Sequence, residues 1–289
     1  LAYGDLALAL QVMAPALVAV PLMLAGTDEQ RAQGIEQFLD ETPPPVTAAL
    51  LEPAISFDPL HPKTTATRDD EGCYLLNGTK AYVPLAEGAQ TILVYALNAE
   101  SGQVDGFFVD GAADGLTVGP REKLMGVRAL PMHRLTLENV RVDPAQRLGG
   151  EAGIDFVAIL AHGRVALGAL AVGVMRAALD YAITYAKERE QFGAPIATKQ
   201  AIAFMLAECA IEVDATRLMV WEAAWKLDQG ADASKEAYLA KEYAAQAALM
   251  VTDAAVQTLG GHGYIREHPV ERWLRDARGF ATFEGLAMV

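Results

Sequence analysis

The sequence contains few of the residues that build disulfide frameworks, metal clusters or surfaces for polyanions. Only two of its 289 residues are cysteines, Cys73 and Cys209, and only five are histidines. Two cysteines so far apart exclude a disulfide scaffold and suit a reducing compartment. Acidic residues outnumber basic ones by 37 to 23, and the formal net charge of −14 argues against nucleic acids or anionic membranes as partners.

Common nucleotide-binding, metal-binding and nucleophile motifs are missing as well. The stretch "LGGHGY" has neither the Rossmann spacing nor the lysine of a P-loop. His262 and His268 are six residues apart without a companion ligand, so we expect solvated or capped surface histidines and no metal site. Ser56 and Ser234 stand outside any nucleophile-elbow pattern.

Apolar residues make up 52% of the chain, which is enough for a sizeable core. One run, residues 6–27, carries no charge and has the length of a membrane span. Pro15 and Pro21 are expected to break it into shorter helices, and Gln11 would be costly in lipid. We therefore predict buried core helices and no membrane span. The chain starts at Leu1 in the middle of a pattern, which suggests that residues precede it.

The order of the patterns predicts an α+β protein. It has an N-terminal helical domain at 1–42, a middle β domain at 43–148 and a C-terminal helical domain at 149–289. Thr27 and Gln30 have the spacing of a capping box that opens a helix. The "TPPP" at 42–45 cannot continue a helix and marks the first boundary.

Short apolar runs with turn signals fill the middle segment and predict an antiparallel barrel or sandwich. Asn77-Gly78 within "CYLLNGTKAYV" is the strongest two-residue hairpin signal. "TILVYAL" and "GFFV" flank a polar loop, and Leu135, Leu137 and Val140 alternate in "HRLTLENVRV".

Helical periodicity returns after residue 150. One helical face collects Ile202, Met205, Leu206, Cys209, Val213 and Val220. The alanine-rich "LAKEYAAQAALMVTDAAVQTL" is apolar on several sides, as expected for a helix with more than one neighbour. Gly260-Gly261 then predicts a helix end.

The stretch "KEREQFGAPI" at 187–196 has two readings. It can be the C-terminus of a helix that carries favourable cations. Alternatively, Arg189 beside a turn with free backbone N–H groups can clamp an anion. The residues alone leave both readings open.

Three stretches have the order and spacing of the acyl-CoA dehydrogenase family: "KEREQFGAPI", "AVQTLGGHGYIREHPVERWLRDAR" and "TFEG". Upstream, "LALALQVMAPALVAVPLMLAGTDEQ" resembles the helical stretch before the family's β domain, and "LEP…LNGTKAYV" resembles its middle domain. The resemblance covers essentially the whole chain and is closest to the medium-chain and short-chain branch. It implies N-terminal helices, a middle antiparallel β-barrel and a C-terminal four-helix bundle, in a chain clipped at both ends.

The resemblance implies an FAD-dependent enzyme that oxidises an acyl-CoA to the trans-2-enoyl-CoA. In this family a carboxylate removes a proton from Cα while the Cβ hydride passes to flavin N5, and Glu284 matches that base. Phe283 and the apolar chain end would keep the carboxylate dry, which raises its pKa and suits a base for a weak carbon acid. Gly285 would leave space for the thioester. The alternative is a carboxylate that only caps or pairs near a chain end.

Two neighbouring positions bear on the substrate. Gly163 matches the place from which a second branch of the family draws its base, so that base is absent. Arg164 matches a family arginine near the CoA channel. An arginine in the apolar run "VALGALAVG" needs an anionic or hydrogen-bonding partner, and a structural salt bridge is the alternative role.

The resemblance also implies the cofactor contacts. A segment that touches the FAD of a neighbouring subunit matches Arg189, Glu190, Gln191 and Phe192, and further contacts match Gln200, Gln257, Gly260 and Gly261. Glycines permit close approach to phosphates, although a helix cap alone would also explain them. A shared site implies a homo-oligomer, commonly a tetramer or dimer of dimers. The family context implies an electron-transferring flavoprotein as acceptor and a cytoplasmic (bacterial) or mitochondrial-matrix location.

The β domain departs from the family pattern where it would hold the flavin ring. Leu51 stands in place of a threonine, and Tyr82, Val83 and Pro84 replace a Trp-Ile-Thr. Pro84 supplies neither a hydroxyl nor a backbone N–H, whereas Tyr82 can still stack. Two alternatives therefore stay open: an acyl-CoA oxidase, and a flavin-poor paralogue that binds acyl-CoA or stabilises a complex.

Overall fold

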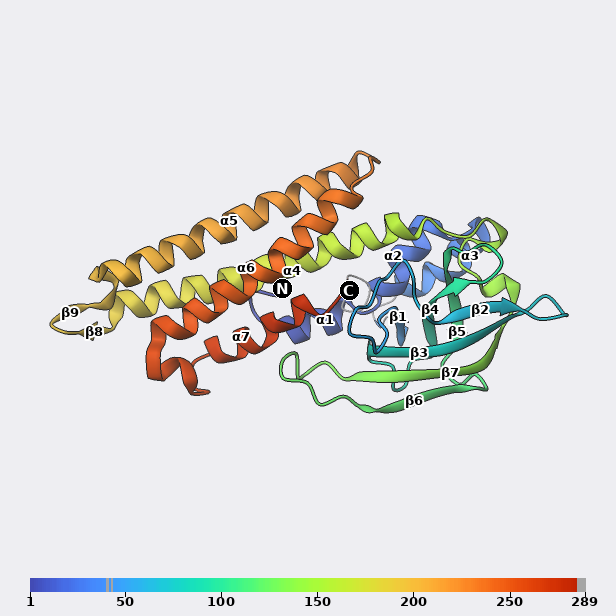
Figure 1. The fold of residues 1–289 in the computed structure, drawn as a ribbon, viewed down its shortest axis with the longest axis horizontal. Coiled ribbons are helices and arrows are strands. Elements are labelled where there is room, and N and C mark those ends of the chain that lie inside the picture. The colour runs from blue at the N-terminus through green and yellow to red at the C-terminus, as the bar shows by residue number, and fades with distance from the viewer. Residues whose placement is uncertain (40–41, 43, 285–289) are drawn as a thin grey trace. The chain divides into compact units, whose positions relative to one another are not determined.

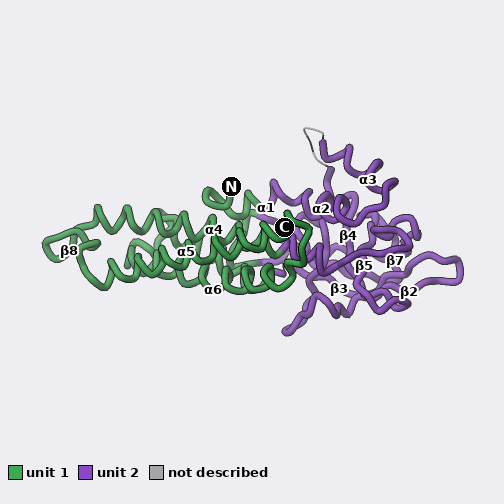
Figure 2. The backbone as a smooth tube through the Cα atoms, turned by 90° about the horizontal axis from the view of Figure 1, so that it is seen from above, with its two compact units in different colours: residues 1–9, 124–129, 164–283 green, residues 10–123, 130–163, 284–289 purple. Residues whose placement is uncertain are grey.

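The computed structural model of the chain describes residues 1–39, 42 and 44–284 and divides into two compact units (Figure 2). The helical unit comprises residues 1–9, 124–129 and 164–283. The sheet unit comprises residues 10–123, 130–163 and Glu284.

Short helices precede the sheet: α1 (Leu6–Met13), α2 (Ala16–Ala25), α3 (Asp28–Gly34) and the 3₁₀ turn η1 (Glu36–Phe38). The predicted capping box opens α3, with the Thr27 hydroxyl accepting from the N–H of Gln30 and the Gln30 side chain accepting from the N–H of Thr27, both at 3.1 Å. Pro15 separates α1 from α2 as predicted. The prediction that Pro21 breaks a helix is wrong: it lies buried inside α2, where its packing outweighs the one amide that it removes.

Within the described residues, seven strands form one sheet: β1 (Val46–Ala49), β2 (Thr65–Arg68), β3 (Tyr74–Pro84), β4 (Thr91–Asn98), β5 (Val104–Asp110), β6 (Leu116–Arg121) and β7 (Met132–Val142). Their order is β1-β4-β2-β3-β7-β6, with β5 paired to β4 (Figure 1). The β2–β3, β3–β7, β4–β5 and β6–β7 pairs are antiparallel, as predicted. However, β1 and β2 run parallel to β4. The sheet is mixed because the chain reaches β4 from these strands through intervening segments and not through a tight turn.

The hairpin predicted at Asn77-Gly78 is wrong, because β3 runs through both residues as one strand. The Asn77 amide donates to Oδ1 of Asn139 on β7 at 3.1 Å, and its own Oδ1 accepts the Asn139 N–H at 2.8 Å. Gly78 is required by close packing, since an added Cβ would lie 2.7 Å from Cα of Thr64. Asn-Gly therefore marks a register shift against β7 instead of a turn.

A buried ion pair holds β3 against the segment that precedes β2. Nζ of Lys80 lies 3.0 Å from Oε1 of Glu52 and donates to the carbonyl of Leu50 at 3.0 Å. Glu52 also accepts from the N–H groups of Lys63 and Thr64 and from the Thr64 hydroxyl. Burial lowers the pKa of Lys80 to about 8, opposed by Glu52. Burial alone would raise the pKa of Glu52, but Lys80 and these hydrogen bonds hold it below its usual value.

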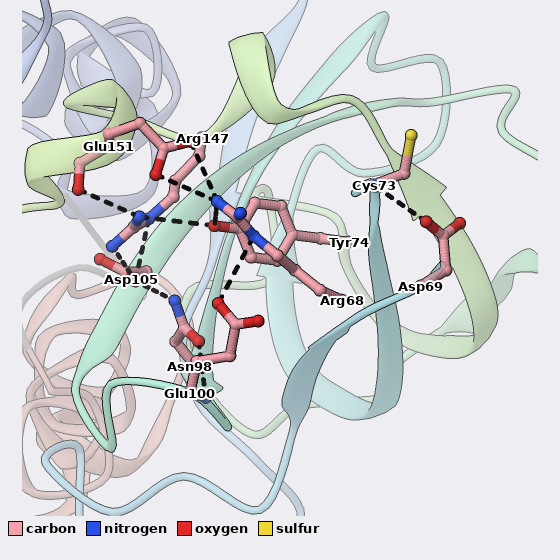
Figure 3. Close-up of polar contacts among 9 residues, drawn as sticks. All are labelled: Arg68, Asp69, Cys73, Tyr74, Asn98, Glu100, Asp105, Arg147 and Glu151. Atoms are coloured by element: carbon pink, nitrogen blue, oxygen red, sulfur yellow. Dashed lines mark hydrogen bonds and ion pairs between the residues drawn. The ribbon is translucent and has the colours of Figure 1, made fainter. Parts of the chain in front are cut away.

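A second polar network ties other strand ends together (Figure 3). Arg147, which follows β7, binds Oδ2 of the buried Asp105 on β5 through Nε at 3.0 Å and Nη2 at 2.7 Å. The Asn98 amide on β4 donates to the same oxygen at 2.9 Å, and Arg68 on β2 donates to the Tyr74 hydroxyl on β3 at 2.9 Å. The buried carboxylate is therefore paired and hydrogen-bonded, as a charge removed from water must be.

The remaining helices are α4 (Phe156–Glu188), α5 (Gln200–Asp228), α6 (Ser234–Leu259) and α7 (Val270–Ala277), with a small hairpin of β8 (Glu190–Gln191) and β9 (Ala194–Pro195) after α4 (Figure 1). The 3₁₀ turns are η2 (Pro144–Gln146), η3 (Gly150–Ala152), η4 (Ile196–Thr198), η5 (Gly260–Tyr264) and η6 (Arg278–Ala281). The face predicted on α5 is confirmed by the burial of Leu206, Cys209, Val213 and Val220. The predicted end of α6 is confirmed by Gly260, whose φ is 56°.

Two stretches of the described chain have the length and apolarity to cross a membrane. They are α4 and the pair α1–α2, which is bent by 45°. Half of the most apolar window of α4 is buried inside the protein, as in a core helix of a bundle. The interpretation of residues 6–27 as core helices stays a prediction.

The loop at residues 124–129 docks on α7 within the helical unit. Gly126 comes so close that an added Cβ would overlap the carbonyl of Arg275. Val127 has a left-handed φ of 45°, and its N–H donates to Oδ1 of the buried Asp276 at 2.5 Å. Burial raises the pKa of Asp276 despite this hydrogen bond.

We expect Lys80→Met to lower the free energy of unfolding by about 3–5 kcal/mol, because it leaves the Glu52 carboxylate buried without its cation. Urea unfolding followed by circular dichroism measures the change. The control is Lys63→Met, the same substitution on an exposed side chain, for which we expect a change within about 0.5 kcal/mol. Equal stabilities of the two variants would contradict the role of the pair.

Asp276 predicts a pH dependence of stability. Because its folded pKa is raised, the native state holds its proton at pH values where the unfolded chain has lost it, and stability falls as pH rises from the unfolded pKa to the folded pKa. Asp276→Asn keeps an acceptor for the Val127 N–H and cannot ionise. The free energy of unfolding of the variant, minus that of the parent protein, should therefore increase with pH in thermal or urea titrations across the acidic range. A difference that stays flat or decreases would contradict this account.

Candidate cofactor and active site

The hairpin between α4 and α5 presents the first group of predicted cofactor residues. Phe192 and Gly193 both have positive φ, 55° and 80°, which is the backbone of a two-residue type I′ turn. Glu190 and Gln191 are exposed on β8, and the Phe192 ring at the tip is 93% exposed. The Phe192 ring is therefore accessible to a ligand or to another copy of the chain.

Arg189 lies at the end of α4, where its backbone binds the carbonyl of Tyr185 and the N–H of Ile196. Its side chain is exposed and forms no hydrogen bond or ion pair with any residue that the structure describes. It borders a cavity of about 390 Å³ whose other walls are Tyr181, Thr184, Tyr185, Glu188, His262 and His268. This geometry favours the anion-clamp reading of the segment, because the cation faces open space.

The two histidines are not the solvated or capped residues that we expected. Their rings stack with centroids 5.2 Å apart and an interplanar angle of 13°. Nδ1 of His262 shares a hydrogen bond with the Tyr185 hydroxyl, and Nδ1 of His268 shares one with the Tyr181 hydroxyl, both at 2.8 Å. Tyr181 and Tyr185 are one turn apart on α4. This cluster was not identified from the sequence. The i, i+4 spacing of the two tyrosines is its one sequence signal, and only the fold brings the two histidines next to these tyrosines.

The histidine–tyrosine bonds position the Gly260-Gly261 turn, which the sequence assigned to the cofactor. An added Cβ at Gly260 or Gly261 would meet nothing within 4 Å, whereas at Gly263 it would overlap the carbonyl of Val256. Close packing therefore explains why residue 263 is a glycine. It does not explain the glycine at 261, whose backbone is open to an approaching ligand. Gln257, one turn before, and Gln200, at the start of α5, are also exposed. No group of three or more possible metal-ligating side chains occurs among the described residues.

In the sheet unit, the end of β3 carries the residues assigned to the flavin ring. The register against β7 shifts between Lys80 and Val83, and Tyr82 within this bulge has a φ of 53°. Leu51, Val83 and Pro84 are buried, and the Tyr82 side chain is half-exposed. The carbonyl of Pro84 accepts from the Thr47 hydroxyl at 2.6 Å. Of these four side chains, Tyr82 presents the most surface to a ligand.

Arg164 lies half-buried on α4 with its guanidinium carbon 5.0 Å from the centre of the Tyr238 ring. The sequence predicted an anionic or hydrogen-bonding partner for Arg164. The structure adds the face of the Tyr238 ring, a partner that the sequence pattern did not indicate. Its role toward CoA stays a prediction.

Phe283 anchors the chain just before the predicted base. Its ring is buried against Gly279, where an added Cβ would lie 2.6 Å from Cε2, and its N–H donates to the Gly279 carbonyl at 3.1 Å. Glu284 follows and is half-buried. Gly285 and the apolar residues after it lie outside the described residues. The structure thus shows how Phe283, the residue before the predicted base, is anchored, and the enclosure of the Glu284 carboxylate stays a prediction.

No sequence pattern indicated a second cavity, of about 490 Å³, in the sheet unit. It lies among α2, α3 and the strands β1, β4 and β5, and its lining includes Gln30, Gln33 and Gln37. Gln30 is already bonded to the carbonyls of Ala145 and Arg147. Among the described lining residues Glu29 alone is titratable, so this cavity offers no acid–base pair for catalysis.

The features of the helical unit fit a phosphate-bearing cofactor such as FAD. Arg189 offers a cation that no described residue pairs with, the Gly260-Gly261 backbone is open, and exposed glutamines offer amides. In the sheet unit fewer groups suit FAD. Tyr82 can stack on its planar ring system, but Pro84 offers no hydrogen-bond donor.

Known proteins resemble this chain over most of its length. The family described as acyl-CoA dehydrogenase, middle domain, matches residues 47–140, and acyl-CoA dehydrogenase, C-terminal domain, matches residues 154–288. A 3-(aryl)acrylate reductase of Clostridium sporogenes is 37% identical over 94% of this chain and 73% of its own length. The subunit CarC of the caffeyl-CoA reductase-Etf complex of Acetobacterium woodii is 38% identical over 93% of this chain and 72% of its own length.

Solved structures confirm the predicted fold. Butyryl-CoA dehydrogenase of Megasphaera elsdenii superposes with a TM-score of 0.88 at 32% identity, over 99% of this chain and 76% of that one. PigA in complex with FAD superposes with a TM-score of 0.87 at 26% identity, over 97% of this chain and 74% of that one. With the two matched domains and the motifs in order, the chain belongs to the acyl-CoA dehydrogenase family of flavoprotein oxidoreductases.

Proposed function

We propose that the protein catalyses FAD-dependent α,β-dehydrogenation of an acyl-CoA thioester to the trans-2-enoyl-CoA. The observation that carries this proposal is Glu284, a half-buried carboxylate directly after the anchored Phe283, at the position of the family's base. A buried neighbour on one side and an apolar sequence on the other suit a carboxylate that must act on a weak carbon acid.

In this proposal Glu284 removes the proton from the carbon next to the thioester carbonyl. Its own backbone N–H donates a hydrogen bond to the thioester oxygen, which stabilises the negative charge that develops there. Arg164, held over the Tyr238 ring, is assigned to the CoA part of the substrate. FAD, when bound, supplies the acceptor for the two electrons that leave Cβ.

The cofactor is assigned to two sets of residues. Arg189 and the open turn at Gly260-Gly261 bind its phosphates, and Gln200 and Gln257 supply amide contacts. Tyr82 stacks on the ring system. Phe192, exposed at the hairpin tip, packs on the FAD of a second copy, so the functional unit is a homo-oligomer.

The same groups can run the reaction in reverse. Reduction of a 2-enoyl thioester needs a proton returned to Cα, and Glu284 is the group to return it. The relatives named 3-(aryl)acrylate reductase and caffeyl-CoA reductase support this second direction, and the Etf complex of the latter supports an electron-transferring flavoprotein as the redox partner of this chain.

Anaerobic reduction of bound FAD by a panel of acyl-CoA thioesters tests the proposed direction and identifies the substrate. Loss of the flavin absorbance with at least one thioester is the expected result. If FAD binds and no thioester reduces it, while a 2-enoyl thioester oxidises reduced enzyme, the reductase direction replaces the first. A protein that binds no FAD would contradict both.

Glu284→Gln should bind FAD and acyl-CoA like the parent protein but slow flavin reduction by about 10²–10⁴-fold, because the amide cannot accept the proton. Stopped-flow absorbance measures the rate, and equilibrium binding confirms that the ligands still bind. Glu267→Gln, the same change at an exposed acid, serves as control and should keep the parental rate. Parental speed in the Glu284 variant would remove this residue from the mechanism.

Arg189→Gln should weaken FAD binding by about 10–100-fold, because a hydrogen bond to a charged group contributes roughly 1.5–3 kcal/mol. Flavin fluorescence during titration of the apoprotein measures the dissociation constant. Lys187→Gln removes the same charge from an exposed side chain two residues earlier and should have little effect. If both variants lose the same affinity, general electrostatics and not a specific clamp binds the cofactor.

A further inference from the structure

The end of β3 combines two left-handed residues with a proline. Tyr82 and Leu85 both have a φ of 53°, although neither is a glycine, and Pro84 lies buried between them. A non-glycine residue keeps this conformation only where the surrounding contacts hold it, and such residues cluster at ligand sites. The contacts around Pro84 therefore decide whether this strand end keeps its shape.

Pro84 lies at a position of the β3–β7 ladder that needs no N–H. It pairs with Met132, and the N–H of the next residue, Leu85, donates to the carbonyl of Pro131 at 2.8 Å. In an antiparallel ladder this pattern makes Pro84 and Met132 a non-hydrogen-bonded pair, whose own N–H and C=O groups point away from the partner strand. The missing amide of Pro84 therefore costs this ladder nothing, but its carbonyl turns away from β7 and needs another donor.

Thr47 on β1 supplies the donor for this carbonyl. Its hydroxyl donates to the Pro84 oxygen at 2.6 Å, and the residue is fully buried. A buried carbonyl that loses its donor is costly. The same segment holds β3 before the bulge, because the carbonyl of Leu51 accepts the N–H of Ala81 at 2.8 Å. Residues 47–51 thus bracket the bulge with one hydrogen bond on each side.

The hydroxyl of Thr47 has a role that an apolar side chain of the same shape cannot fill. Residues two apart on a strand share a face, and Ala49 belongs to the apolar core together with Val83. Valine has the size and β-branching of threonine and would suit this face. What threonine adds is the hydroxyl, and the structure uses it on Pro84.

We propose that Thr47 is a positioning residue for the flavin ring of FAD. By holding the Pro84 carbonyl it fixes the backbone of residues 82–84, and with it the direction in which the half-exposed Tyr82 ring is presented. The inference rests on the proposed function, which assigns Tyr82 to the ring system. Thr47 is itself fully buried, so it acts through this backbone and not by contact with the cofactor.

Thr47→Val removes the hydroxyl and keeps the shape of the side chain, whereas Thr47→Ser keeps the hydroxyl. We expect Thr47→Val to weaken FAD binding by about 3–10-fold, the effect of losing one buried hydrogen bond, and Thr47→Ser to retain the parental dissociation constant. The fluorescence of bound flavin should rise in Thr47→Val, because a stacked tyrosine quenches it and the ring of Tyr82 is no longer held in place. Titration of the apoprotein with FAD measures both quantities.

Thr216→Val serves as the matched control. The Thr216 hydroxyl is also buried and donates to a backbone carbonyl, that of Glu212 at 2.7 Å, but both residues lie on α5 in the helical unit. This variant should keep the parental FAD affinity and flavin fluorescence even where urea unfolding shows a loss of stability. If it lowers FAD affinity as much as Thr47→Val does, loss of stability explains both variants and the inference is overturned.

A double-mutant cycle with Tyr82→Leu tests whether Thr47 acts through the tyrosine. Because Tyr82→Leu removes the ring, adding Thr47→Val to it should change FAD affinity and fluorescence less than Thr47→Val does in the parent protein. Additive effects, or a Thr47→Val protein with parental affinity and fluorescence, would overturn the inference and leave the proposed function standing. A parent protein that binds no FAD would contradict the proposed function itself, and with it this role of Thr47.

Discussion

The ion pair between Lys80 and Glu52 is the interaction on which the end of β3, the part of the sheet unit that we assign to the flavin ring, depends. It joins β3 to the segment that contains Leu51, and the strand leaves the β7 register directly after Lys80. Two charges removed from water are tolerated because each has several hydrogen-bond partners. The pair thus anchors β3 immediately before the bulge, in which Tyr82 has a left-handed φ and a half-exposed side chain while Val83 is buried.

In the helical unit, neutral side chains and not an ion pair hold the predicted cofactor-binding turn in position. Glycine has a large conformational freedom. The Gly260-Gly261 turn must nevertheless hold one conformation if it is to bind phosphates. Two tyrosines on the rigid α4 bond the histidines that follow this turn, and the stacked rings fill the space between. The cavity beside them ends at Arg189, so one surface of α4 supplies both the support of the turn and the cation.

Sequence patterns predicted the elements whose signals are local. The capping box at Thr27, the inner face of α5 and the α6 end at Gly260 depend on residues within a few turns of one another, and all are confirmed. The hairpin at Asn77 failed because its side chain found a partner on β7, 62 residues away. Propensity describes what a segment prefers alone, and a tertiary hydrogen bond of this kind overrides it.

By itself, the sequence determined the family and the order of helices and strands, because contiguous motifs carry this information, and it predicted Glu284 as the base. Tertiary structure decided which surfaces those motifs could use. It turned the two histidines from expected surface residues into a stacked support, placed an aromatic face against Arg164 and buried Pro84. Burial and pairing are properties of contacts between distant residues, and those contacts exist only once the chain has folded.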